Sequence, residues 1–317
     1  MQNIKIDGLG NFSGGEYGTV HIDGVASCHG DITCESMCAD GTFHCGGNLT
    51  AKTASADGTL NVSGNMTAET FEIDGAASIQ GDLHAPKLSV DGSFSVKGTL
   101  HTERFDIDGA ASVQSDLYAQ KISVDGSLSV QGTTETDILE VDGTVKLAAL
   151  RAKQFNCDGS AHITELSCAE KIHIDGTMQT DGNLEAETLY VDGCLSAKKQ
   201  ISADKIEICG SVQADEIVGD HIRIEFDPRP RMIRQIRDYV NSIVNNLLNR
   251  EQPARDCCAN LIEATTVELT GVTAGVVSGE NVVIGEGCRI DRVDYTGSCF
   301  IDPSSTVRLM NGQPYNA

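Results

Sequence analysis

Apolar residues along this chain recur in pairs separated by one residue, and successive pairs follow at steps of five or six residues. One stretch contains the pairs Phe105/Ile107, Ala111/Val113, Leu117/Ala119, Ile122/Val124 and Leu128/Val130. A period of two is typical of a β-strand, in which alternate side chains face the same side. Each stretch of about 17 residues therefore predicts three short strands that point their apolar pairs inward.

The dipeptide Asp-Gly returns with the same long period. It begins at Asp7, Asp23, Asp40, Asp57, Asp74, Asp91, Asp108, Asp125, Asp142, Asp158, Asp175 and Asp192. Asp-Gly favours a tight turn, because Asp bonds the local backbone and Gly adopts positive φ. Cys209-Gly210 occupies the next place in this frame.

Three short strands and one fixed turn per period predict an all-β fold, a parallel β-helix whose coils stack at about 4.8 Å. Residues 1–227 form a regular segment of about 13 such coils. A helical repeat of twice this period is the competing interpretation. It is disfavoured, because period-two pairs and frequent Gly do not build helices.

One outward position alternates between serine and a carboxylate. It reads Ser55, Glu72, Ser89, Asp106, Ser123 and Glu140 on successive coils. Like charges directly opposite on neighbouring strands are destabilising. The alternation predicts carboxylates spaced at about twice the coil spacing, although duplication of a two-coil unit also explains it.

The repeat is interrupted over residues 228–258, and a shorter, irregular β-helix segment is expected at 259–317. The interruption has apolar residues at i, i+3, i+4 and i+7, which predicts an amphipathic helix over about 230–249. Its basic and apolar positions include Arg229, Arg231, Met232, Arg234, Ile236, Arg237, Tyr239, Ile243 and Leu247. The apolar stripe is expected to pack on the β-helix, with an anionic membrane surface or a partner as the alternative.

The formal net charge of −23 and pI of about 4.5 disfavour nucleic-acid binding, which requires Lys and Arg to neutralise phosphates. The N-terminal sequence has no apolar signal region and the chain no apolar run of membrane-spanning length, so a cytoplasmic location is expected, with or without membrane association. The 12 Cys are expected to be mostly free thiols in a reducing compartment.

Four groups of residues are candidates for chemistry, and none predicts a catalytic, metal or cofactor site. The recurring Asp residues fit turns better than Ca²⁺ ligands. His84 and His101 are one period apart and should stack on the outer face, but two His are too few for zinc. Cys28 and Cys45 fit an inward, buried position. Cys257-Cys258 is expected in a loop.

The Asp-Gly coils and the closing segment "VVIGEGCRIDRVDYTGS" resemble the bactofilins, in particular the Firmicute-type branch. The resemblance implies a right-handed triangular β-helix that polymerises end to end without nucleotide, often in association with a membrane. It also implies that the partner is a second copy of the chain or a homologous subunit. The length of the regular segment and the Arg-rich interruption depart from the usual family member.

We therefore expect a structural, self-assembling protein and not an enzyme. The edges of the first and last coils should expose unpaired backbone groups, which are templates for pairing with another chain. The residues expected there are Ile4, Ile6, Val307 and Leu309. The alternative is a β-helix enzyme. A polysaccharide lyase would need long loops on one face, and a hexapeptide acyltransferase would need 18-residue coils and a His on a protruding loop.

Overall fold

The computed structural model describes residues 1–226 and 257–315. The predicted helix at 230–249, with its Arg and apolar positions, lies outside the described residues. The described residues form strands and turns, without a helix among them, and they contain no helix long and apolar enough to span a membrane. The chain divides into two compact units, Met1–Thr164 and Glu165–Ala317.

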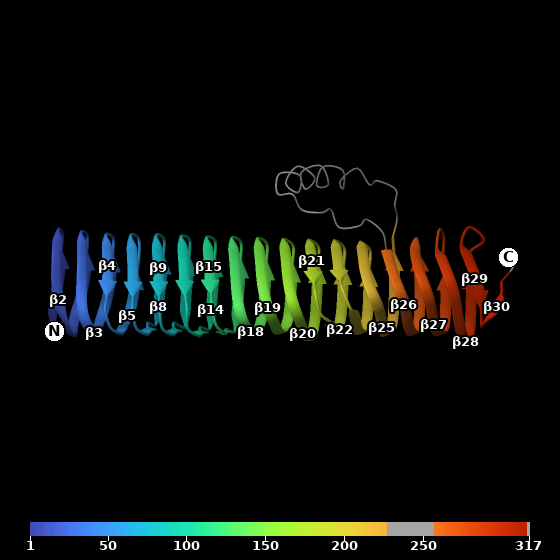
Figure 1. Ribbon diagram of the computed structural model, residues 1–317, viewed down its shortest axis with the longest axis horizontal. Helices are drawn as coiled ribbons and strands as arrows, with labels where there is room; N and C mark the ends of the chain where they lie inside the picture. Colours follow the sequence, from blue (N-terminus) through green and yellow to red (C-terminus); the bar gives the residue numbers. More distant parts are fainter. Residues whose placement is uncertain (227–256, 316–317) are drawn as a thin grey trace. The chain divides into compact units, whose positions relative to one another are not determined.

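The first unit contains strands that follow one another in sequence order from blue to green in Figure 1. They are β1 (Gln2–Ile6), β2 (Leu9–Ile22), β3 (Val25–Ala39), β4 (Thr42–Cys45), β5 (Leu49–Ser55), β6 (Thr59–Val62), β7 (Met66–Thr67), β8 (Thr70–Ile73), β9 (Ala76–Ile79), β10 (Leu83–His84), β11 (Lys87–Val90), β12 (Ser93–Val96), β13 (Leu100–His101), β14 (Arg104–Ile107), β15 (Ala110–Val113), β16 (Leu117–Tyr118), β17 (Lys121–Val124), β18 (Ser127–Val141) and β19 (Thr144–Cys157). The strand β20 (Ser160–Ile174) crosses the boundary between the units.

Each coil in the regular part of this unit consists of three strands, as the apolar pairs predict. The coil that begins at β11 continues through β12 and β13 before β14 starts the next one. Each of these strands pairs in parallel with its equivalent one sequence period further on, so Leu88 lies opposite Phe105 and Leu83 opposite Leu100. The sequence period is therefore the length of one coil, and the fold is a parallel β-solenoid.

The interior is built from columns of apolar side chains that stack along the coils. Phe71, Phe105 and Leu83 are fully buried in this way. Thr102 also points inward, and its hydroxyl donates to the backbone oxygen of Arg104 at 2.9 Å. A buried hydroxyl with a partner avoids the cost of desolvation without a hydrogen bond.

The Asp-Gly turns are confirmed as a corner of the coils that contain them, but the reason for their glycine differs from the prediction. Positive φ among the described glycines occurs at Gly30, Gly271, Gly287 and Gly312, and not in the repeated turn. A Cβ on Gly75 would instead lie closer than 3.0 Å to the carbonyl oxygen of Gly58 in the preceding coil. The coils approach so closely here because the backbone N–H of Thr59 donates to Gly41 at 2.7 Å and successive turns repeat this bond. Glycine is therefore required by the close approach of two backbones.

A second corner of the coil is held by a ladder of Asn and Asp side chains that was not predicted from the sequence. The backbone N–H of Asn65 donates to Oδ1 of Asn48 at 2.8 Å, and that of Asp82 donates to Oδ1 of Asn65 at 2.9 Å. The same bond joins Asn48 to Asp31 and Thr99 to Asp82. Each side-chain oxygen thus accepts a hydrogen bond from a backbone N–H of the next coil that has no partner in the strand pairing.

The second unit continues with parallel pairing but with coils of varying length. Its strands are β21 (Thr177–Thr180), β22 (Leu184–Val191), β23 (Cys194–Ala197), β24 (Gln200–Ile208), β25 (Ser211–Glu225), β26 (Cys257–Thr270), β27 (Val272–Ile284), β28 (Arg289–Ile301), β29 (Thr306–Met310) and β30 (Gln313–Pro314). Strand β25 pairs directly with β26, so the chain on both sides of residues 227–256 belongs to neighbouring coils. From β26 onward the register step changes from coil to coil, as the pairs Cys257↔Val272, Thr273↔Arg289 and Arg289↔Thr306 show.

The prediction of a loop at Cys257-Cys258 is wrong. Both residues lie in β26, and Cys257 is buried at 1% exposure. Cys257 pairs with Val272 in the next coil and alternates with Cys258 between the inside and the outside of the strand. The start of β26 at Cys257 was not predicted, because no Asp-Gly turn directly precedes this strand in the sequence.

Candidate assembly site

The first strand, β1, forms the N-terminal edge of the first unit. It pairs with β2 on one side, with Ile4 opposite Val20 and Ile6 opposite Ile22. Val20 and Ile22 are buried, whereas Ile4 and Ile6 are only half-buried. The apolar cross-section of the solenoid is therefore incompletely covered at this coil, which is where the sequence placed an assembly edge.

Two exposed apolar side chains lie next to this edge. Leu9 and Val25 are neighbours in register and are 88% and 49% exposed. The same column continues with Thr42, Thr59 and Ala76 in the following coils. Large apolar side chains thus occupy an outward position only in the first two coils of this column, where a partner could cover them.

The last coil of the second unit carries the other two residues that the sequence placed at an edge. Val307 is buried at 6% exposure and pairs with Ile290, whereas Leu309 is half-buried and pairs with Arg292. The strand β30 pairs antiparallel with β29, and Pro314 lies opposite Leu309. Part of this edge is therefore covered by the chain itself.

The hairpin that brings β30 onto β29 was not predicted from the sequence. Its turn is Asn311-Gly312, and both residues have positive φ, at 45° and 74°. Asn-Gly between two strand segments is a strong hairpin signal for this reason. This signal is present in the sequence, but the parallel repeat that precedes it does not predict an antiparallel strand.

A second exposed apolar pair lies near the C-terminal end of the second unit. Phe300 is 58% exposed and Val283 is 40% exposed, and the two are neighbours in register on β28 and β27. Two adjacent coils again carry large apolar side chains on the outside. Each unit therefore has an apolar patch close to its terminal coils.

The alternating ladder between Ser55 and Glu140 is confirmed by the strand register. Glu72 lies between Ser55 and Ser89, and Asp106 lies between Ser89 and Ser123. No two carboxylates of this ladder are therefore direct neighbours.

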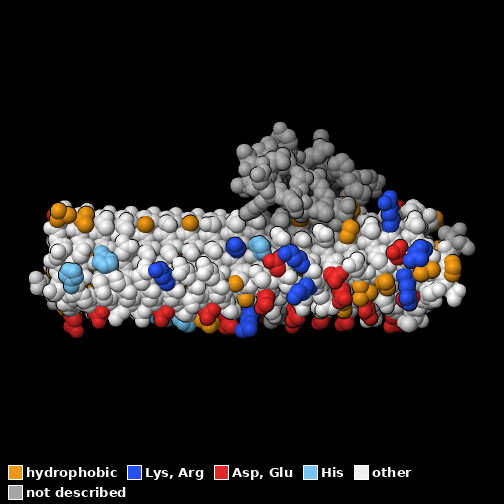
Figure 2. Space-filling view, in the orientation of Figure 1, with side chains coloured by type: hydrophobic (Ala, Val, Ile, Leu, Met, Phe, Trp, Pro, Cys, Tyr) orange, Lys and Arg blue, Asp and Glu red, His pale blue; other side chains and the backbone are white. Residues whose placement is uncertain are grey.

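The ladder carboxylates are also close to a column of basic residues. Lys121 lies 2.7 Å from Glu140 and Arg104 lies 2.6 Å from Asp106. These ion pairs are exposed and each contributes little on its own. On the face shown in Figure 2, acidic side chains gather along one edge.

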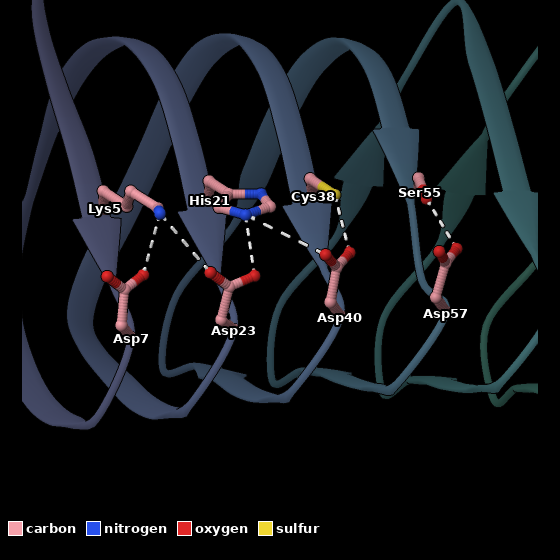
Figure 3. Close-up of polar contacts among 8 residues, drawn as sticks. All are labelled: Lys5, Asp7, His21, Asp23, Cys38, Asp40, Ser55 and Asp57. Carbon is pink, nitrogen blue, oxygen red and sulfur yellow. Dashed lines mark hydrogen bonds and ion pairs between the residues drawn. The ribbon is translucent and has the colours of Figure 1, made fainter.

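In the first four coils the residue two positions before the turn Asp contacts that Asp directly (Figure 3). Lys5 lies 3.1 Å from Asp7, and His21 Nε2 lies 2.7 Å from Asp23. The other two contacts are hydrogen bonds, from Cys38 Sγ to Asp40 at 2.9 Å and from Ser55 Oγ to Asp57 at 3.0 Å. In these four coils the turn Asp thus contacts a side chain that precedes it by two residues, whereas the Asp-Gly pattern predicts a bond to the local backbone.

The two His and the two Cys that lie one period apart occupy the positions that the repeat predicts. His84 and His101 are neighbours in register on the outer face, and the ring of His101 stacks on Tyr118 at 4.8 Å. Cys28 and Cys45 are free thiols, buried and opposite one another. Burial, followed by the neighbouring Cys45, raises the pKa of Cys28 to about 11 from its ordinary 9.0. A thiol held in its protonated form is a poor nucleophile.

The described residues define a repetitive protein of the parallel β-solenoid class. Residues 53–135 match the family model of bactofilin, described as polymer-forming cytoskeletal. The resemblance drawn from the sequence is thereby confirmed for this segment.

Two curated relatives from Bacillus subtilis (strain 168) match shorter stretches of the chain. Uncharacterized protein YhbE is 42% identical over 60 residues, which is 19% of this chain and 25% of the relative. Uncharacterized protein YhbF is 40% identical over 50 residues, which is 16% of this chain and 21% of the relative. The chain thus spans a quarter or less of the length of the curated relatives it matches. No solved structure matches the chain significantly.

Proposed function

We propose that this chain is a structural subunit that assembles end to end into cytoskeletal filaments without nucleotide, with a second copy or a homologous subunit as its partner. The observation that carries the proposal is the incompletely covered first coil, with half-buried Ile4 and Ile6, in a chain whose residues 53–135 match a polymer-forming family. A β-strand edge offers N–H and C=O groups to a further strand. Stacking a second solenoid on β1 would extend the interior columns by one coil.

The same contact would cover apolar surface. Ile6 continues the buried column of Ile22, so a further coil would remove its remaining exposed area from water. Leu9 and Val25 lie on the flank of the same coils. Apolar area contributes about 25 cal/mol per Å² when it leaves water. In the proposed contact, backbone pairing with β1 therefore sets the orientation of the second solenoid, and burial of apolar area contributes to the affinity.

The test is sedimentation of the purified chain in nucleotide-free buffer. The chain is expected to pellet as polymer, and Ile6→Asp is expected to remain in the supernatant, because a carboxylate would be buried at the contact. Gln114→Asp is the matched control, since it adds the same charge at an exposed position within the regular coils. The proposal is wrong if Ile6→Asp pellets as the unchanged chain does.

Binding to an anionic membrane is a separate proposal that rests on the sequence of residues 229–247. Four Arg within nine residues, in a chain of net charge −23, are suited to anionic head groups. Vesicles with anionic lipid should retain the chain and neutral vesicles should not. Replacing Arg229, Arg231, Arg234 and Arg237 by Glu should abolish retention. Equal retention of the substituted and the unchanged chain by anionic vesicles would contradict the proposal.

The enzyme alternative is not favoured. Regular coils with tight corners continue through the segment that matches the family model, and the description of that model is structural. The lyase interpretation required long loops on one face, and the acyltransferase interpretation required 18-residue coils.

A further inference from the structure

Figure 3 shows the side chains that contact the turn Asp residues in the first four coils, and two successive coils differ from the others in the type of side chain. Lys5 and Ser55, at the two ends of this row, are ordinary donors to a turn Asp. Between them the donors are His21 and Cys38, which are neighbours in register. An imidazole and a thiol can both donate a hydrogen bond, but they are also preferred ligands of transition metals.

Their ligand atoms converge on the carboxylate of Asp40. Asp40 Oδ2 lies 3.8 Å from His21 Nε2, and Asp40 Oδ1 lies 2.9 Å from Cys38 Sγ. The ligand atoms of His21, Cys38 and Asp40 all lie within 4.8 Å of one another, which makes this the one such group of three in the described residues. Asp23 offers a fourth ligand atom, since its Oδ1 lies 2.7 Å from the same imidazole nitrogen.

These separations fit a tetrahedral metal ion. With metal–ligand distances of about 2.0–2.3 Å, the ligand atoms of a tetrahedral zinc site lie about 3.2–3.8 Å apart. Small rotations of exposed or half-buried side chains close the remaining difference, and the strand backbone that carries them is fixed by parallel pairing.

We propose that His21, Cys38 and Asp40, with Asp23 as the fourth ligand, bind a divalent transition metal ion of the zinc class. The donor set of one nitrogen, one sulfur and two oxygens excludes a preference for Ca²⁺ or Mg²⁺, which take oxygen ligands. On binding, the cation replaces the thiol proton of Cys38, which passes to solvent. The ion would join the second and third coils, next to the N-terminal edge, and this inference does not depend on filament formation.

The simpler explanation is that His21 and Cys38 only donate to the turn Asp, as Ser55 does. The chain contains the controls that separate the two explanations. Cys38→Ser keeps a hydroxyl donor in the geometry of Ser55 and Asp57 but removes the sulfur ligand. His173 in the second unit lies 3.2 Å from Asp175, with Tyr190 as its register neighbour and no Cys in that place.

The experiment is a Co²⁺ titration of the full chain after removal of metals by a chelator, followed by absorption and repeated in competition with Zn²⁺. The unchanged chain should show a thiolate-to-cobalt charge-transfer band that Zn²⁺ abolishes and excess Ca²⁺ does not. Cys38→Ser should lose this band, and His21→Ala should weaken Co²⁺ binding by about tenfold or more. His173→Ala should bind within twofold of the unchanged chain.

Circular dichroism of each variant identifies any loss of fold, and amide hydrogen exchange supplies a readout independent of absorption. Zn²⁺ should slow exchange in residues 20–40 of the unchanged chain and not of Cys38→Ser. The proposal would be overturned if Cys38→Ser and His21→Ala showed a charge-transfer band as strong as that of the unchanged chain. The sulfur ligand would then be another Cys. The absence of any band in the unchanged chain would also overturn the proposal.

Discussion

The glycine of the Asp-Gly turn is the residue on which coil stacking depends most directly. Its Cβ position is occupied by the carbonyl oxygen of the preceding turn, so no other residue fits while the coils remain paired. Gly8 differs from the others, because nothing lies within 4 Å of its Cβ position. The same dipeptide is therefore indispensable inside the stack and tolerant at its N-terminal edge.

Gly75→Ala is expected to lower the free energy of unfolding by about 1–3 kcal/mol, the usual cost of overpacking. Gly8→Ala, its matched control, should change it by less than about 0.5 kcal/mol, as for exposed sites. Urea denaturation measures both. Equal effects would show that close packing of coils is not the reason for the glycine.

The buried thiols make the stability of the chain sensitive to alkaline pH. The pKa of Cys28 is raised to about 11 in the fold by burial and by Cys45, whereas its ordinary value is 9.0. The fold therefore favours the protonated thiol. This contribution is fully present below pH 9 and is lost as the pH rises from 9 to about 11.

Cys28→Val should reduce the loss of unfolding free energy between pH 7 and pH 10. Valine suits the site, since Val62 occupies the same column two coils further on. Urea denaturation of both chains at the two pH values provides the comparison. An identical loss in the two chains would assign the alkaline effect to other groups.

For single residues, the sequence predicted where a side chain lies more reliably than why that residue type is needed there. The inward direction of Cys28 and Cys45 followed from the period of two. The role of the turn glycine did not, because a repeated Asp-Gly is compatible both with positive φ and with close backbone approach. Only the distance between coils, which depends on the stacked fold, distinguishes the two.

At the scale of the strands, the outward ladder from Ser55 to Glu140 places acidic side chains on parallel strands without pairing them directly. Directly paired carboxylates would lie about 4.8 Å apart along the stack. The serines separate them, and Arg104 and Lys121 lie beside two of them. No ladder carboxylate thus has a second carboxylate at the same position of an adjacent coil.

Ser89→Asp would add a carboxylate between Glu72 and Asp106, so that three consecutive coils carry one. It should destabilise the chain by up to about 1 kcal/mol at low ionic strength. The loss should shrink in 1 M salt, where the Debye length falls to about 3 Å. Ser89→Asn is the neutral control, because Asn156 follows Glu140 in the same column. A salt-independent loss, shared by both variants, would point to packing and not to charge.

At the element scale the three strands per coil and their register were predictable, because each period repeats both the apolar pairs and the turn. The ladder of Asn48, Asn65 and Asp82 was missed, although Gly-Asn-Leu, Gly-Asn-Met and Gly-Asp-Leu recur in frame. Strand β30 was missed because it breaks the parallel rule. The coils after residue 256 vary in length and contain no Asp-Gly turn, so their boundaries could not be predicted.

For the molecule as a whole, the regular coils and the incompletely covered first coil favour assembly over catalysis. The chain has repeated structure in which each coil contacts its neighbours, so a contact that adds one more coil needs no new type of interaction. In the proposed assembly, the end of the stack at β1 and the exposed apolar pair of Leu9 and Val25 would form this contact. Gly8, with open space at its Cβ, lies on the same edge.

The central claim is most directly tested by electron microscopy of the purified chain in nucleotide-free buffer, at several protein concentrations and at low and high salt. The account predicts unbranched filaments that lengthen with concentration and that shorten or disappear in Ile6→Asp, while Gln114→Asp resembles the unchanged chain. Single, unassembled molecules of the unchanged chain under all these conditions would contradict it.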